Sequence, residues 1–94
     1  MWVLITIART KSEKRPEFMN TIVSMSTEIR GNEGNVGYDY YVDEQDNNII
    51  TIKTFWQSWD DLENFMKSDL VKVLKGAAQI LCVEEETNYY EISK

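Results

Sequence analysis

The sequence predicts an α+β domain in which four antiparallel strands and two helical segments follow the order β-α-β-β-α-β. Three observations lead to this fold class. Runs of β-branched and aromatic residues occur at both ends and in the middle of the chain, as strands require. Two segments between them place apolar residues at helical spacing. The polar run 43–48 separates the two middle strands as a turn. The 94 residues suit one domain, expected to span 1–94.

The first strand is expected over Trp2–Thr10. It is apolar, or nearly so, on both faces: Val3, Ile5 and Ile7 alternate with Leu4, Thr6 and Ala8. A strand with two apolar faces is typical of the centre of a covered sheet.

The first helix is expected to begin within Ser12–Pro16, because proline suits the first turn of a helix. One apolar face follows, made of Phe18, Ile22, Met25 and Ile29. Gly31 supplies the stop.

The middle of the chain predicts a hairpin of two strands, Val36–Val42 and Ile49–Trp56. Alternation places Tyr38 and Tyr40 on the same face, where Tyr40 is expected to pack against the paired strand.

The second helical segment begins at a cap provided by either Ser58 or Asp60. It is expected to break near Ser68–Asp69, and it either ends at Gly76 or continues through Ala77–Leu81. The last strand is expected over Cys82–Ile92.

This order is that of a ferredoxin-like fold, with both helices on one face of the sheet. The other face of the first strand then needs a cover, which a chain of this size finds most easily in a second copy of itself. We therefore expect a homodimer in which two sheets pack face to face.

Composition argues against several classes of partner. The 16 acidic and 10 basic residues give a net charge of −6, which opposes binding to nucleic acid or to an anionic membrane. With no histidine and the single Cys82, the chain offers no zinc site, and no metal is expected. The opening eight apolar residues are too few for a membrane span, and the expected location is the cytoplasm.

Several stretches resemble the antibiotic biosynthesis monooxygenase family of dimeric α+β-barrel proteins. They are Glu33-Gly34 before Tyr38, the hairpin, TFWQSWDDLENFMKSDLVKVL from Thr54, and the final NYYEI. The family includes small quinone-forming monooxygenases and relatives that degrade haem. Trp56 matches a tryptophan that closes the third strand in this family.

The chain departs from the family pattern at polar positions. Thr54 replaces a frequent glutamate, and Phe65 and Leu70 stand where many members have histidines. Haem-degrading relatives use an asparagine in the first strand, a tryptophan and a ligating histidine. This chain has Ile7 and Ala8 in that strand and would need Tyr, Met or Cys82 as the ligand, so neither haem nor another cofactor is expected.

The resemblance implies a mostly apolar pocket between sheet and helices. Its expected walls are Trp56, Tyr38, Phe65 and Leu70. Asn20 on the first helix and Arg9 at the end of the first strand are polar candidates for substrate binding, although each is more simply explained as a solvated surface residue. Taken without the family, Trp56 is more simply explained as core, and the resemblance makes core and cavity wall equal explanations.

Two functions remain open on this fold. The first is a cofactor-independent monooxygenase that oxidises a small aromatic of the quinol or anthrone type, in which the substrate anion passes an electron to O₂. The alternative is a small-ligand-binding or regulatory dimer without catalysis. No catalytic residue is assigned from the sequence, because both expected histidine positions are apolar.

Overall fold

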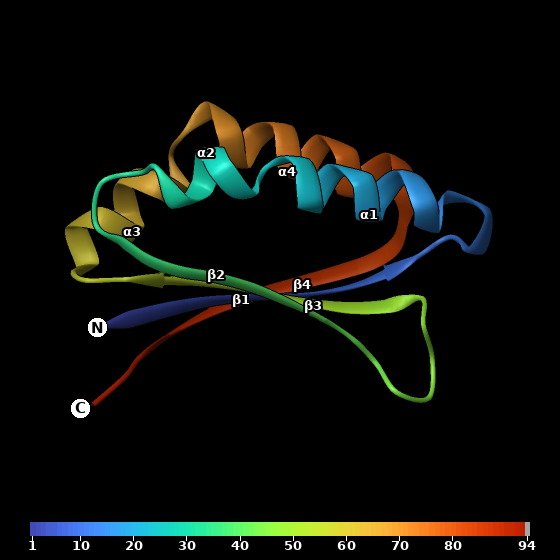
Figure 1. Cartoon of the computed structure of the whole chain (residues 1–94), viewed down its shortest axis with the longest axis horizontal. Helices are drawn as coiled ribbons and strands as arrows, with labels where there is room; N and C mark the ends of the chain where they lie inside the picture. The colour runs from blue at the N-terminus through green and yellow to red at the C-terminus, as the bar shows by residue number, and fades with distance from the viewer. Residues whose placement is uncertain (94) are drawn as a thin grey trace.

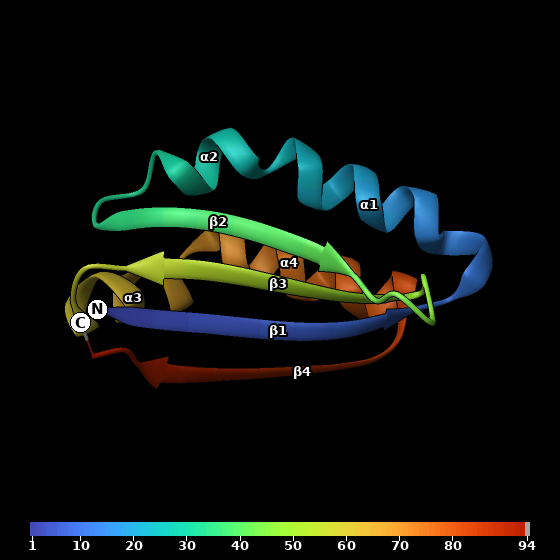
Figure 2. The ribbon, with the colours of Figure 1, turned by 60° about the horizontal axis from the view of Figure 1, so that its bottom comes forward.

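The computed structural model describes residues 1–93 and has a four-stranded antiparallel sheet with its helices on one face (Figure 1). The strands are β1 (Trp2–Thr10), β2 (Asn35–Val42), β3 (Ile49–Trp56) and β4 (Cys82–Glu91). Their spatial order is β2-β3-β1-β4, as Figure 2 shows. The ferredoxin-like prediction is therefore confirmed, with the strand limits within one residue of those expected.

The helical layer consists of a short 3₁₀ turn and four helices. They are η1 (Ser12–Lys14), α1 (Arg15–Ser24), α2 (Ser26–Arg30), α3 (Trp59–Met66) and α4 (Asp69–Leu81). The break before Asp69 was expected, and the helix does continue through Gly76 to Leu81. Side-chain caps explain where α3 and α4 begin. The Ser58 hydroxyl accepts a hydrogen bond from the Asp61 amide, and the Ser68 hydroxyl accepts one from the Val71 amide.

The first expected helix is interrupted at Met25, which its apolar spacing did not predict. The Thr21 and Ser24 hydroxyls both donate to carbonyl oxygens of the preceding turn, at 2.9 Å each. Such bonds compete with the helical ladder and bend it. The interruption places Phe18 and Ile22 over one part of the core and Ile29 over another.

Two clusters of buried side chains fill the space between sheet and helices. The first gathers around Trp56 and contains Leu4, Ile29, Tyr38, Leu62, Phe65 and Val71. The second contains Ala8, Phe18, Ile22, Ile50, Ala78, Leu81 and Cys82. Ile52 of β3 packs against both, so the clusters adjoin along the middle of the sheet.

The central strand β1 pairs with β3 on one side and β4 on the other, as its two apolar faces predicted. Leu4 and Ala8 enter the two clusters beneath the helices. Alternation turns Val3, Ile5 and Ile7 to the opposite face, which no helix covers in Figure 1. Ile7 is 46% exposed there.

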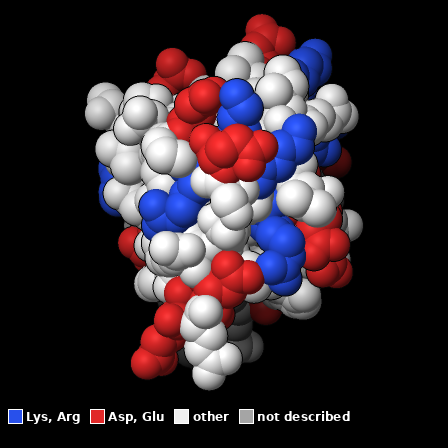
Figure 3. Space-filling model, turned by 90° about the vertical axis from the view of Figure 1, so that its right-hand side faces the viewer, with Lys and Arg blue, Asp and Glu red and all other residues white. Residues whose placement is uncertain are grey.

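Charged side chains of both signs are mixed at the end of the molecule where α1 begins (Figure 3). Two ion pairs found there are Arg9 with Asp46, at 2.7 Å, and Lys14 with Glu17, at 3.4 Å. No continuous basic surface is visible on this face. Within residues 1–93, none of the helices is long and apolar enough to cross a membrane.

Gly34 makes the turn into β2 with a positive φ of 80°. Its carbonyl oxygen accepts a hydrogen bond of 2.9 Å from the Gln57 amide, which ties this turn to the end of β3. A Cβ atom at Gly34 would lie 2.1 Å from the Asp61 carboxyl carbon. Both the backbone angle and the close approach therefore require glycine here.

Gly34→Ala should lower the free energy of unfolding by about 1–3 kcal/mol, because alanine strains the backbone and displaces Asp61 from the start of α3. Gly76→Ala is the matched control: nothing lies within 4 Å of its added Cβ, and the position is inside α4. It should raise stability by about 0.5–1 kcal/mol. Chemical denaturation of both variants measures this, and equal effects would contradict the assignment.

Candidate functional site

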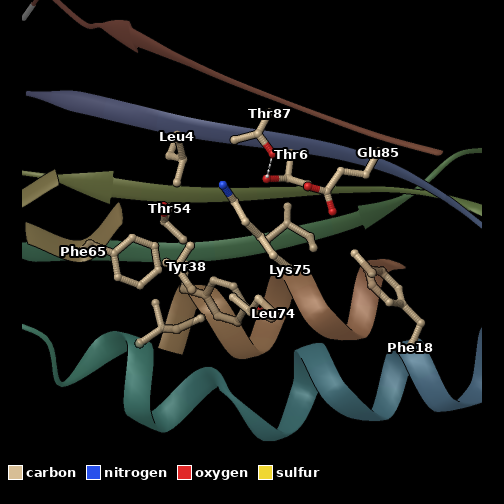
Figure 4. A pocket seen from close by; sticks show the side chains of 14 residues that line it. Leu4, Thr6, Phe18, Tyr38, Thr54, Phe65, Leu74, Lys75, Glu85 and Thr87 are labelled. Atoms are coloured by element: carbon tan, nitrogen blue, oxygen red, sulfur yellow. Dashed lines mark hydrogen bonds between the residues drawn. The ribbon is translucent and has the colours of Figure 1, made fainter. Parts of the chain in front are cut away.

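A cavity of about 70 Å³ lies between the sheet and the helices, where the two core clusters meet. Most of the 14 side chains that line it are apolar (Figure 4). They come from all four strands and from the helices α1, α2, α3 and α4. The apolar part is formed by Leu4, Phe18, Ile29, Tyr38, Ile52, Phe65, Val71, Leu74 and Ala78. Five further residues, Thr6, Thr54, Lys75, Glu85 and Thr87, are polar.

Tyr38 and Phe65, both expected at the pocket, line this cavity. Tyr38 is only 1% exposed, and its hydroxyl donates a 2.7 Å hydrogen bond to the Ile22 carbonyl oxygen of α1. Burial raises the pKa of Tyr38 to about 12, and the neighbouring Tyr40 adds to the shift. At neutral pH Tyr38 is therefore a protonated wall residue whose hydrogen is already committed to the backbone.

Trp56 lies beside the cavity without lining it. The side chain is fully buried, its ring stacks on Phe65 at a centroid distance of 4.5 Å, and its indole N–H donates to the Thr54 hydroxyl at 2.9 Å. Thr54 does line the cavity. Trp56 thus acts on the cavity through two neighbours, and its expected role in ligand binding stays a prediction in this indirect form.

Three hydroxyl groups give the sheet side of the cavity hydrogen-bonding capacity. The Thr6 and Thr87 hydroxyls are bonded to each other at 2.9 Å, which uses one of their two hydrogens. The Thr54 hydroxyl accepts from Trp56 and makes no second hydrogen bond within the described residues 1–93. Its own hydrogen, and one from the Thr6–Thr87 pair, can therefore be donated to a ligand oxygen.

The model of the antibiotic biosynthesis monooxygenase family matches residues 1–76. The chain belongs to this family. A comparison with curated proteins finds no match.

Solved structures share the fold over nearly the whole chain. A candidate antibiotic biosynthesis monooxygenase from Deinococcus radiodurans has a TM-score of 0.93 at 15% identity, covering 100% of this chain and 94% of its own. A conserved protein from Methanosarcina mazei has a TM-score of 0.89 at 26% identity, covering 98% and 92%. The first likeness is one of fold alone, because its sequence identity is low.

The other expected site residues lie outside the cavity. Leu70 packs against the first cluster without reaching the cavity, and Asn20 is exposed on α1. Arg9 lies on the other face of the sheet, where it pairs with Glu84 in the strand register. Its guanidinium group is bonded to Asp46 at 2.7 Å and to Glu84 at 3.3 Å. None of these three lines the cavity, and their expected roles in substrate binding stay predictions.

The structure brings two charged residues to the cavity that the sequence did not single out, Lys75 of α4 and Glu85 of β4. The signal for Glu85 is present in the strand alternation: it pairs with Ala8 and so faces the helices, whereas Glu84 and Glu86 pair with Arg9 and Ile7 on the other face. Lys75 follows Leu74 on α4 and precedes Ala78, both of which line the cavity.

Two of the residues that could ligate haem, Tyr38 and Cys82, are engaged or buried in this structure. The Tyr38 hydroxyl is bonded to the Ile22 carbonyl oxygen. Cys82 belongs to the second cluster, where burial raises the pKa of its thiol to about 11. Among residues 1–93, no three or more acidic or cysteine side chains come together as metal ligands.

Tyr38→Phe should lower the free energy of unfolding by about 1–2 kcal/mol at neutral pH, because the Ile22 carbonyl oxygen loses its buried donor. Wild-type stability should also fall as the pH rises from 10.0 to about 12, since tyrosine ionises in the unfolded chain while Tyr38 stays protonated in the folded one. The variant should lack this component. Denaturation at several pH values measures both effects.

Tyr40→Phe is the control, because Tyr40 is 38% exposed and its ring lies 6.0 Å from that of Tyr38. It should change stability little at neutral pH. An equal loss in the two variants would show that the Tyr38 hydroxyl contributes nothing specific. Cys82, with its raised pKa, adds its own decline between pH 9.0 and about 11 in every variant.

Proposed function

We propose that this protein is a cofactor-independent monooxygenase that oxidises a small aromatic substrate of the quinol or anthrone type. The observation that carries the proposal is the cavity itself, which is apolar over most of its wall and polar at one end. An aromatic ring matches the apolar part, and a ring hydroxyl matches the end that bears Thr6, Thr87, Lys75 and Glu85. The membership of the chain in a monooxygenase family supports the reaction type.

The reaction needs no external reductant, because the substrate supplies the electrons. For 1,4-naphthohydroquinone, one molecule and one O₂ give 2-hydroxy-1,4-naphthoquinone and one water. One oxygen atom enters the ring and the other leaves in water, together with two hydrogens of the substrate. The tasks left to the protein are to hold the substrate anion, exclude bulk water and stabilise charge as the anion meets O₂.

The size of the site limits the substrate to a few rings at most. A cavity that holds benzene needs roughly 150 Å³, so a ring does not fit the 70 Å³ space without movement. A neighbouring hollow of about 360 Å³ shares Lys75, Ala78 and Glu85 with the cavity. Lys75 is an exposed and flexible side chain, and a substrate that displaces it would occupy both spaces.

A binding protein without catalysis is the second function that this cavity supports. The apolar wall alone would hold an aromatic ligand, and the fold does not separate the two functions. Turnover does separate them, because a binding protein would retain its ligand unchanged in the presence of O₂.

The wild-type protein should convert 1,4-naphthohydroquinone to 2-hydroxy-1,4-naphthoquinone faster than buffer does. Ala78→Leu should abolish this conversion, because Ala78 lines the cavity and the larger side chain fills it. The fold should persist, since the added carbons enter empty space. Oxygen uptake measures the rate, and labelled dioxygen should place one labelled atom in each product molecule.

Ala77→Leu is the matched control, because Ala77 lies on the same helix, packs against the second cluster and does not line the cavity. It should keep the wild-type rate. Formation of naphthoquinone and peroxide at the buffer rate would contradict the monooxygenase, and saturable binding of the quinol without turnover would favour the binding protein. Equal activity in wild type and Ala78→Leu would remove the cavity from the mechanism.

We also propose that the protein functions as a homodimer through the sheet face that the helices leave open. Ile5 and Ile7 of β1, Tyr41 of β2 and Tyr90 of β4 contribute to this face, and the last three are between 46% and 53% exposed. A patch of this kind at the centre of a sheet is unfavourable in water. Two copies packed face to face would cover it in both chains at once.

Sedimentation at micromolar concentration should give about twice the chain mass of 11.0 kDa. Ile7→Glu should convert the dimer to monomer, because a carboxylate would be buried without a partner at the interface. Ile80→Glu is the control, since Ile80 is 66% exposed on α4 and lies on the helical side. A wild-type monomer, or the same dissociation in both variants, would contradict this interface.

A further inference from the structure

The polar end of the cavity carries one positive and one negative side chain. Within the described chain, Lys75 and Glu85 are the charged residues among those that line the cavity. Figure 4 shows Lys75 extending from α4 toward the sheet and Glu85 extending from β4 into the same region. The hydroxyl-bonded pair Thr6–Thr87 lies alongside, because Thr87 follows Glu85 by two residues on the same face of β4.

We propose that Lys75 and Glu85 together bind the acidic hydroxyl of the substrate, with Lys75 stabilising the oxygen anion and Glu85 accepting its proton. This inference rests on the proposed function and defines its substrate class further. The substrate is an aromatic of a few rings at most with a phenol or enol hydroxyl at its outer end. Its ring faces the apolar wall around Tyr38 and Phe65, and its hydroxyl faces α4 and β4.

The charged groups near Lys75 and Glu85 determine which of them can bind the anion and which can accept the proton. In residues 1–93 neither Lys75 nor Glu85 forms an ion pair with another side chain. Glu84 borders the neighbouring hollow, and its carboxylate is paired with Arg9 at 3.3 Å, whereas Glu86 pairs with Ile7 on the other face of the sheet. Tyr38 remains protonated, because burial raises its pKa to about 12, and it cannot serve as a base at neutral pH. The chain has no histidine.

The proton transfer balances within these groups. The O–H bond of the substrate breaks, its electron pair stays on the substrate oxygen, and a new O–H bond forms on a Glu85 carboxylate oxygen. A carboxylate is a weaker base than a phenolate, so the transfer depends on the attraction between the new anion and the Lys75 ammonium. Because Glu85 is exposed, it can pass the proton on to water and return to the carboxylate form.

The nitro-substituted phenol 4-nitrophenol tests the binding half of this proposal, because its ionisation is visible in its absorption spectrum. Saturating wild-type protein should lower the apparent pKa of 4-nitrophenol by roughly 0.5–1 unit, as expected for an anion beside a partly solvated cation. Lys75→Met should abolish the shift and weaken binding of the nitrophenolate about tenfold. Lys75→Arg should keep most of the shift, because the positive charge remains.

Two controls separate charge from general damage. Nitrobenzene has the same ring without the hydroxyl, and its binding should be unchanged in Lys75→Met. Lys72→Met removes a cation from the same helix that is 74% exposed and lies near Asp69 rather than the cavity, and it should keep the wild-type shift. Absence of saturable 4-nitrophenol binding, or an equal shift in wild type and Lys75→Met, would overturn the proposal.

Oxygen uptake with 1,4-naphthohydroquinone tests the role of Glu85. Glu85→Gln should slow turnover by about 100-fold with little effect on nitrophenolate affinity, because the variant keeps the shape of the site and loses only the base. Glu86→Gln, on the other face of the sheet, should turn over at the wild-type rate. Unchanged turnover in Glu85→Gln would overturn the assignment of the base.

The monooxygenase activity and the Lys75–Glu85 site can be refuted separately. A Lys75-dependent nitrophenol shift without turnover of any quinol would refute the monooxygenase and leave the anion site standing. Turnover that is lost in Ala78→Leu but unaffected in both Lys75→Met and Glu85→Gln would support the monooxygenase and refute this charged pair.

Discussion

The packing of helices onto the central strand β1 determines both the core and the cavity. Leu4 and Ala8, on the helix-facing side of β1, each belong to one of the two buried clusters. Thr6 lies between them on the same face, and its hydroxyl is bonded to Thr87. The cavity opens where the two clusters meet, and Thr6 is one of the residues that line it. The bonded hydroxyls of Thr6 and Thr87 therefore border the empty space.

Trp56 and the residues that it contacts, Phe65 and Thr54, stabilise one side of this cavity. The indole ring stacks on Phe65, and its N–H group fixes the Thr54 hydroxyl two residues earlier on the same face of β3. On the neighbouring strand Tyr38 is paired with Thr54 and is bonded to α1 through Ile22. Sheet and helices are thus held apart at a defined distance by large side chains whose polar atoms are all satisfied. This rigidity preserves the cavity against collapse.

Much of the fold could be predicted from the sequence because its patterns are local. Alternation located the strands, helical spacing located α3 and α4, and Ser58 marked a helix start. The interruption at Met25 could not be predicted from apolar spacing, since it depends on hydroxyl bonds within the turn. Tyr38 and Phe65 were expected at the cavity from the family resemblance, and both line it. Trp56 also points inward, but its indole N–H donates to the Thr54 hydroxyl on the same strand, and its ring lies in the core.

Lys75 and Glu85 could not be identified as cavity residues from the sequence, for a different reason. Lys75 and Glu85 both appear exposed in the sequence pattern, and both are exposed in the structure. Their relevance arises only because the edge strand β4 passes α4 closely enough for the two to line one cavity. Periodicity shows which face a residue occupies and carries no information about the distance between two residues on different elements, such as Lys75 on α4 and Glu85 on β4. Glu85 is separable from its acidic neighbours by alternation alone, once the β4 register is known.

The absence of histidine from the chain changes what the site has to supply. Tyr38 and Cys82 are kept neutral at physiological pH by burial, which raises the pKa of each. The interior therefore contributes shape and hydroxyl groups, and among residues 1–93 the charges that line the cavity are those of Lys75 and Glu85. A rim of this kind favours substrates that are themselves easily ionised and oxidised, because the protein then needs to stabilise an anion rather than create a strong base. For such a substrate the site has to supply a positive charge and a weak base, which are the groups that Lys75 and Glu85 carry.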